Sequence, residues 1–229
     1  AAKWWCAKRS GKALGELGRR EMKNCIEMRK LKFIAAAWLF ALVGSGLAAC
    51  SSVSPAPEDH YYRLQATYAG SGSMATPLSG TIEIDRFVAD GLTSERGLVY
   101  SNANAPSQVK AYHYHLWIKP PTVMLRDELV SFLREARAAK AVVTPELRVD
   151  AEYVLTGKIE HLEQVRGKSE RTLMEIELAL RAAKTGKLLF LKTYRQENAA
   201  AQGVEGAVDS LNTALSIIYA DFLADLEKR

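Results

Sequence analysis

Residues 171–181 alternate between apolar and polar side chains, and this alternation limits the possible fold more than any other stretch of the sequence. The apolar positions are Met174, Ile176, Leu178 and Leu180, and the positions between and after them are Glu175, Glu177, Ala179 and Arg181. Successive side chains of a strand point to opposite faces of a sheet. The pattern therefore predicts a strand with one buried and one solvated face.

Two further strand-like runs flank this one, at residues 153–165 and 187–195. Turns are predicted around Gly167 and at Thr185-Gly186, so the three runs should form an antiparallel meander. A sheet with one apolar face has to bury that face against another layer. The sequence therefore predicts helices packed on one side of the sheet.

Two stretches have the apolar spacing of amphipathic helices. One begins at Thr122 and ends near residue 139, and its stripe consists of Leu125, Leu129, Phe132, Leu133 and Ala136. The other is the C-terminal stretch, with a stripe consisting of Val204, Val208, Leu211, Leu215, Ile218, Phe222 and Leu226. The spacing of three and four residues in both predicts helices that pack on the sheet.

Shorter runs predict the remaining strands, at residues 60–64, 81–88, 112–118 and 141–144. We expect residues 91–107 to form a loop. The fold class is then α/β in the α+β sense, a mixed twisted sheet with an antiparallel meander covered by two helices. The domain should span residues 60–229.

An apolar stretch at residues 33–43 follows a basic start at residues 28–32, and small residues lead from it to Cys50. This is the plan of a secretory signal peptide over residues 28–49. The apolar run is too short to span about 30 Å of hydrocarbon comfortably, which makes a transmembrane helix the weaker interpretation. Leu47-Ala48-Ala49-Cys50 resembles the lipobox of bacterial lipoproteins.

That resemblance implies a covalent lipid on Cys50, with an S-diacylglyceryl group and an N-acyl (palmitate) chain, and cleavage just before this residue. Residues 50–59 then form a linker, and the mature chain has no free thiol because Cys6 and Cys25 lie upstream. Aspartate after the cysteine favours inner-membrane retention in such lipoproteins, so Ser51 implies the periplasmic face of the outer membrane of a Gram-negative bacterium. We expect residues 1–27 to be an over-extended reading frame, with translation starting at Met28 or, less favoured, at Met22. The alternative is that these residues are an authentic long leader.

Charge and composition exclude several classes of protein. A chain of 229 residues with 48% hydrophobic and 25% charged residues is neither wholly disordered nor a polytopic membrane protein. The net charge of +5 comes from residues 1–49, which carry ten basic and three acidic residues, so the rest of the chain is at −2. This balance and the lack of a recognisable motif argue against binding of nucleic acid.

Catalytic and metal-binding patterns are weak. His113 and His115 share a strand face if the strand is regular, but Asp85, Asp90 and Glu95 are neighbours only in sequence, so packed or exposed histidines are favoured over a metal site. The chain has no nucleophile elbow, P-loop or HExxH motif, and Glu175 and Glu177 are expected on a solvated face. We expect no enzyme activity, no metal and no cofactor besides the lipid on Cys50.

An aromatic group around residues 112–117 is the strongest candidate for a contact surface. Tyr112, Tyr114 and Trp117 carry rings that suit either a protein core or a surface between lipid, partner and water. Tyr100, in the predicted loop, adds a fourth ring. We predict a partner or lipid contact along this loop and strand, with packing in the core as the alternative.

The order of these features resembles the ABC-type transport auxiliary lipoproteins, the PqiC-like family. The resemblance rests on the lipobox, residues 61–64, the alternating strand at 81–88, Leu98-Val99-Tyr100, the segment 112–121 and the long last helix. It implies a non-enzymatic, outer-membrane-anchored component of a lipid transport system, with an ABC permease and ATPase and a periplasmic MCE-domain protein as partners. A homo-oligomer is also possible on this basis. Another envelope-biogenesis or outer-membrane assembly lipoprotein is the alternative.

Overall fold

The computed structural model describes residues 56–70 and 77–228. The chain divides into two units, residues 1–56 and 57–229, and the fold described here is that of the second unit. Cys50 and the predicted leader lie outside the described residues. The buried apolar core of the second unit runs from Leu64 to Leu226. This unit therefore has a complete hydrophobic core of its own and should fold without residues 1–56.

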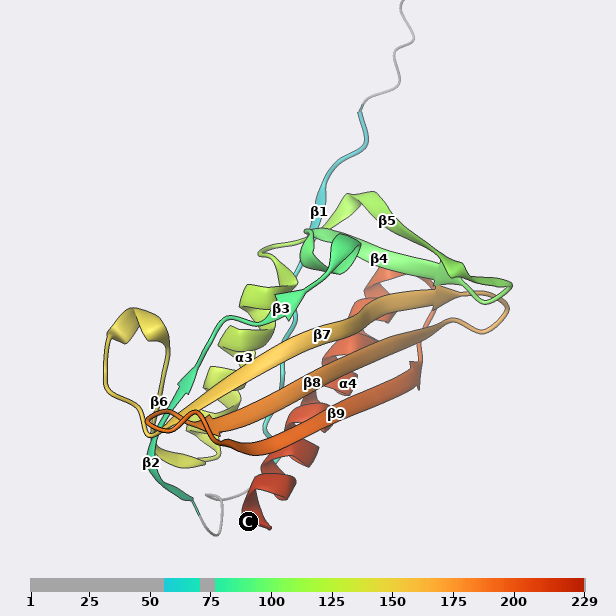
Figure 1. The fold of residues 1–229 in the computed structure, drawn as a ribbon. Coiled ribbons are helices and arrows are strands. Elements are labelled where there is room, and N and C mark those ends of the chain that lie inside the picture. The colour runs from blue at the N-terminus through green and yellow to red at the C-terminus, as the bar shows by residue number, and fades with distance from the viewer. Residues whose placement is uncertain (1–55, 71–76, 229) are drawn as a thin grey trace, which may run out of the picture. The chain divides into compact units, whose positions relative to one another are not determined.

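The predicted meander is confirmed and extends from the central strand of the sheet to one of its edges (Figure 1). It consists of β7 (Tyr153–Arg166), β8 (Arg171–Ala182) and β9 (Leu188–Ala199), paired antiparallel in that order. On β8 the four predicted apolar side chains are at most 1% exposed. The alternating charged side chains face the opposite, solvated side, where Glu175 accepts a hydrogen bond from Arg195 of β9 at 2.5 Å.

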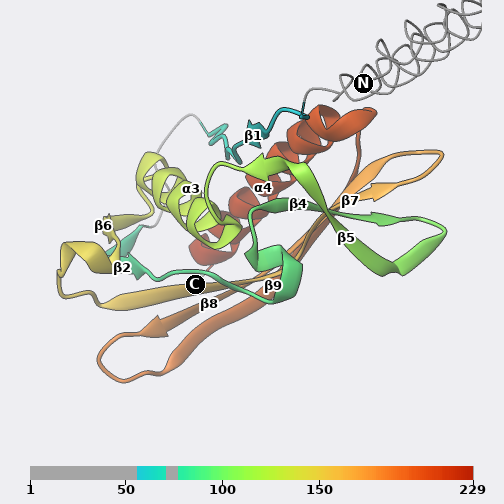
Figure 2. The ribbon, with the colours of Figure 1, turned by 90° about the horizontal axis from the view of Figure 1, so that it is seen from above.

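Three N-terminal strands pair one after another, in parallel, along the other edge of β7. They are β2 (Leu78–Ile84), β3 (Val88–Ala89) and β4 (Gly97–Asn102). The sheet continues beyond β2 through β6 (Ala139–Val143), and beyond β4 through β5 (Ala105–Trp117) and β1 (His60–Tyr62). Along this edge of β7 the sheet thus continues as two separate parts, β2 with β6 and β4 with β5 and β1 (Figures 1 and 2). We call the part formed by β4, β5 and β1 the β1–β5 wing.

Both predicted helices are confirmed, and both cover the same face of the sheet (Figure 2). They are α3 (Pro121–Glu135) and α4 (Gly203–Glu227). α3 begins at Pro121, where a proline needs no amide partner, and it ends four residues before the predicted end. The reason lies at Arg137, whose φ of 49° is in the left-handed region and cannot continue a helix. The fully buried Tyr219 of α4 donates a hydrogen bond to the Leu125 carbonyl of α3 at 2.7 Å and so joins the two helices.

The predicted strand over residues 81–88 is divided into β2 and β3. Residues 85–87 leave the ladder, and the ring of Phe87 packs directly over Gly157 of β7. A Cβ at position 157 would lie 2.6 Å from that ring, so only glycine allows this close approach.

The predicted loop over residues 91–107 is wrong. A short 3-10 helix, Gly91–Ser94, leads into β4, and β5 already begins at Ala105. Leu98, Val99 and Ser101 of β4 are all buried, so exposed and buried side chains do not alternate along this strand. Residues 102–110 are all exposed, since the β4–β5 hairpin projects as a two-stranded ribbon, and they show no apolar period at all.

Candidate functional site

The structure brings two of the four predicted contact residues together and separates the other two. Tyr100 on β4 and Tyr112 on β5 lie with ring centroids 4.5 Å apart. Tyr114, also on β5, is 44% exposed. Trp117 is only 1% exposed and belongs to the hydrophobic core, so its ring is not part of a contact surface.

The Tyr100 and Tyr112 rings belong to a longer aromatic row. His115 packs edge to face against Tyr112 at 5.2 Å, and it also stacks on Tyr62 at 5.8 Å and on His60 at 5.1 Å. Tyr112 and His115 reach the same side of β5 because the pairing of β4 with β5 shifts register between residues 111 and 116. We call His60, Tyr62, Tyr100, Tyr112 and His115 the aromatic row.

A chain of hydrogen bonds connects the aromatic row to the start of α4. The Tyr112 hydroxyl donates to Gln164 Oε1 at 2.8 Å, and Gln164 Nε2 donates to Glu170 Oε2 at 2.7 Å. The same carboxylate accepts the amide of Gly203, the first residue of α4, at 3.1 Å. Gln164 is only 3% exposed, so these bonds supply the partners that a buried amide requires. Burial raises the pKa of Tyr112 above 10.0, which keeps its hydroxyl a donor.

A second link joins β1 to the first turn of α4. Tyr62 donates its hydroxyl hydrogen to Glu205 Oε1 at 3.0 Å, and the Tyr62 hydroxyl oxygen itself lies 2.9 Å from His115 Nδ1. Burial, together with the hydrogen bond to Glu205 and its charge, raises the pKa of Tyr62 to about 12. The pKa of Glu205 is lowered by its own backbone amide and by the Tyr62 hydroxyl. The carboxylate is thus stabilised at the amino end of the helix, where the dipole favours negative charge.

We predict that Tyr62→Phe lowers the free energy of unfolding by roughly 1 kcal/mol at neutral pH, a value reduced for solvent exposure. Because the folded-state pKa of Glu205 is below 4.5, its contribution is complete above that pH and disappears as the pH falls through the lowered value. Urea unfolding of both proteins near pH 7 and near pH 3 should show the difference shrinking in acid. Tyr61→Phe is the matched control, since the Tyr61 hydroxyl bonds the exposed Asp59. An effect of Tyr62→Phe that persists unchanged near pH 3 would contradict the link.

The two histidines singled out as possible metal ligands lie in different surroundings. His115 is engaged by Tyr62 and stacked in the aromatic row, whereas His113 is exposed. Within residues 56–70 and 77–228, no group of three or more His, Cys, Asp or Glu side chains could hold a metal ion. What the aromatic row itself displays is ring contact and hydrogen bonding.

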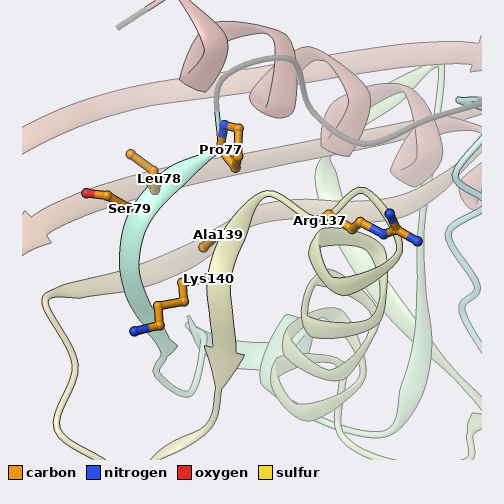
Figure 3. Close-up of a pocket in the computed structure, with 6 residues that line it drawn as sticks. All are labelled: Pro77, Leu78, Ser79, Arg137, Ala139 and Lys140. Atoms are coloured by element: carbon orange, nitrogen blue, oxygen red, sulfur yellow. The ribbon is translucent and has the colours of Figure 1, made fainter.

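An open hollow of about 400 Å³ lies between β2 and β6 (Figure 3). Pro77, Leu78 and Ser79 form one side of it, and Arg137, Ala139 and Lys140 form the other. Pro77 directly follows residues 71–76, which lie outside the described part, so we assign no ligand to this hollow. Across the described residues, no helix has the length and apolar character needed to cross a membrane.

The sequence alone did not point to His60, Tyr62, Gln164, Glu170 or Glu205. Tyr62 and Glu205 lie 143 positions apart, and their meeting depends on where α4 crosses the sheet. The sequence around Gln164 carries no local signal either, because Glu163 precedes it and most of residues 160–166 are polar, so nothing there marks Gln164 as buried. Its burial is known only from the structure, where a buried amide requires hydrogen-bond partners.

Comparison with known proteins agrees with this architecture. A crystal structure of a Xanthomonas campestris protein assigned to the DUF330 family superimposes with a TM-score of 0.62 at 14% identity, covering 73% of this chain and 93% of that one. A second crystal structure, of an uncharacterised protein, gives 0.59 at 15% identity and covers 74% and 99%. At these identities the likeness concerns the fold alone. No curated protein matches the sequence.

The sequence was also compared with models of protein families. The family described as "ABC-type transport auxiliary lipoprotein component" matches residues 62–221, a range that includes β4, β5, α3, the whole meander and α4 as far as residue 221. This match covers well over half of the chain. The protein therefore belongs to the family of ABC-type transport auxiliary lipoprotein components.

Proposed function

We propose that the protein is an outer-membrane-anchored, non-enzymatic component of an ABC/MCE-type system that moves lipids between two membranes. The family match over residues 62–221 carries this proposal, because it names both a lipoprotein and a role beside an ABC transporter. The partners are an ABC permease with its ATPase and a periplasmic MCE-domain protein, and lipid attached at Cys50 holds the protein at the membrane. Adjacent genes for a permease, an ATPase and an MCE-domain protein would separate this role from that of another outer-membrane assembly lipoprotein.

The partner contact is proposed on the β4–β5 ribbon and the aromatic row beside it. β1 pairs only with residues 115–117 of β5, so the outer edge of β5 from 105 to 114 has no strand beside it in the described structure. Val109 and Tyr114 on this edge strand are each 44% exposed. An open strand edge beside exposed aromatic side chains suits the addition of a strand from a partner.

A pull-down with the MCE-domain protein tests this assignment. Tyr100→Ala, Tyr112→Ala and Tyr114→Ala should each weaken capture, with Tyr114→Ala costing little stability because its side chain is exposed. Leu215→Ala is the control, since Leu215 is 0% exposed in α4. It should lower the free energy of unfolding by about 2 to 5 kcal/mol through cavity formation and still bind below its melting temperature.

Thermal melting of each variant separates lost contact from lost folding. If the three tyrosine variants stay folded and are captured as well as the parent, the ribbon is not the contact. If Leu215→Ala alone loses capture while folded, the contact lies nearer α4.

A further inference from the structure

Exposed apolar side chains occur on β1, along β5 and directly after it. Among the described residues, eleven large hydrophobic side chains are exposed, and four of them lie on β1, on β5 or immediately after β5. These four are Tyr61, Val109, Tyr114 and Ile118. The largest exposed fraction of the four, 55%, belongs to Tyr61, in the middle of β1.

The strand register fixes which face Tyr61 occupies. His60 and Tyr62 turn toward His115 and the first turn of α4, so Tyr61 between them points to the face without helices. Tyr61 is paired with Leu116 of β5, which shares that face. The guanidinium of Arg96 lies 5.5 Å from the centre of the Tyr61 ring, and its Nε donates to the Trp117 carbonyl at 2.9 Å.

Ile118 extends this surface just beyond β5. Its amide donates to the Tyr62 carbonyl at 2.8 Å, and its side chain is 44% exposed. We call Tyr61, Arg96, Leu116 and Ile118 the β1 patch. The β1 patch is distinct from the free strand edge at residues 105–114. The patch lies on a face of the β1–β5 wing, whereas the free edge is the unpaired side of β5.

The chain length upstream of β1 restricts what can cover the β1 patch. Tyr61 is eleven residues after Cys50, and an extended chain spans at most about 3.6 Å per residue. A lipid on Cys50 therefore keeps Tyr61 within roughly 40 Å of the membrane surface at full extension, and nearer in any other conformation. The patch is thus the exposed apolar surface that follows the anchor most closely in the described chain.

The composition of the patch suits a bilayer surface. Tyrosine rings with a polar hydroxyl are enriched at the boundary between lipid and water, where an apolar body and a polar tip are both satisfied. Arg96 is the one charged member of the β1 patch, and the Asp59 carboxylate lies beside it, accepting a hydrogen bond from the Tyr61 hydroxyl at 3.1 Å. Lys119, next to the patch, forms an ion pair with Asp127 at 3.3 Å. Apolar contact rather than attraction to anionic lipid is then the main contribution.

We propose that the β1 patch rests on the phospholipid surface in which Cys50 is anchored. This contact holds the domain in one orientation, with the β1–β5 wing toward the membrane and β9, at the opposite edge of the sheet, away from it. The inference rests on the lipid anchor proposed above, and it adds a second, weaker contact to that anchor.

Fluorescence of the chain from residue 50 onward, tethered to vesicles, tests the orientation without requiring native acylation. Cys50 is the only cysteine in that segment and can be coupled to a maleimide lipid in phosphatidylethanolamine/phosphatidylglycerol vesicles. Tyr61→Trp places an indole in the patch, and Leu191→Trp places one on β9 as a control with a similar exposed fraction, 53%. The buried Trp117, the only native tryptophan after Cys50, supplies the background that the parent protein measures.

We expect the Tyr61→Trp emission to shift to the blue and to be quenched by lipids brominated in the acyl chains, and the Leu191→Trp emission to do neither. Adding Ile118→Ser should reduce the quenching of Tyr61→Trp. The same result is expected in phosphatidylcholine vesicles, since three of the four patch residues are uncharged and the carboxylate of Asp59, bonded to Tyr61, offsets the charge of Arg96.

Absence of quenching at both positions overturns the proposal, and so does equal quenching at both, which would mean that the domain touches the vesicle without a preferred face. Quenching that requires phosphatidylglycerol would contradict the apolar basis of the contact. Because the anchor is supplied chemically, none of these outcomes depends on whether Cys50 is acylated in the cell. A cell-derived protein without acyl groups would instead contradict the anchor alone.

Discussion

Trp117→Ala should lower the free energy of unfolding by about 3–5 kcal/mol, the range for removal of a large aromatic side chain from a core. Trp117 is the last residue of β5 and is 1% exposed. Its amide and carbonyl are both engaged by Arg96, at 2.6 Å and 2.9 Å, so the backbone would hold the strand in place around the cavity. Urea unfolding of residues 57–229 measures the difference.

The same variant decides between the two roles that the sequence left open for this tryptophan. Trp117→Phe, which keeps most of the packing, should be much less destabilising than Trp117→Ala. Both should still capture the MCE-domain protein below their melting temperatures, because the ring does not reach the surface. A Trp117→Ala protein with parental stability and lost capture would restore Trp117 as a contact residue.

Cys50→Ala should release the protein from the membrane fraction almost completely. Acyl chains contribute about 0.8 kcal/mol for each buried methylene, and three chains exceed the two signals that stable anchoring requires. The β1 patch is far too small to replace them. Fractionation of cells that express the parent and the variant measures the loss, and mass spectrometry of the parent should find an acylated N-terminal Cys50.

Cys50→Ser is the conservative control, because a hydroxyl keeps the size of the side chain and removes the thiol that accepts the lipid. A Cys50→Ala protein that stays in the membrane fraction, or a parent chain that retains residues 33–49 unmodified, would disprove lipidation at this position. Neither result would alter the vesicle experiment on the β1 patch.

The elements that the sequence predicted well are those with one solvated and one buried face. Ile176 and Leu178 alternate with charged neighbours because β8 packs under α4 on one side only, and a period of two remains visible. The stripe on α4 is equally clear, since Leu211, Leu215 and Ile218 face the sheet while the other side is solvated.

The elements that the sequence did not predict lack this contrast between a solvated and a buried face. Leu98 and Val99 are neighbours in sequence and both are buried, so β4 shows no alternation, while the exposed start of β5 is polar throughout. The candidate site was harder still to predict. Tyr112 was identified from local aromatic content, but its partner Gln164 is 52 positions away, and only the packing of β4 between β5 and β7 brings the two side chains together.

The position of β7 in the sheet also determines when the rest of the molecule can assemble. β2, β3 and β4 all pair with β7, yet they leave the ribosome 50 or more residues before it. Until residue 166 has emerged, β4 can pair with β5 and β2 with β6, but these separate pairs keep apolar side chains and open strand edges because β7 is not yet there to join them. β7, β8, β9 and α4 are contiguous in sequence and pair locally, so they have the lower entropic cost of association. The half of the domain that is synthesised first is therefore completed last, and its open strand edges need protection from aggregation until the carboxyl-terminal half arrives.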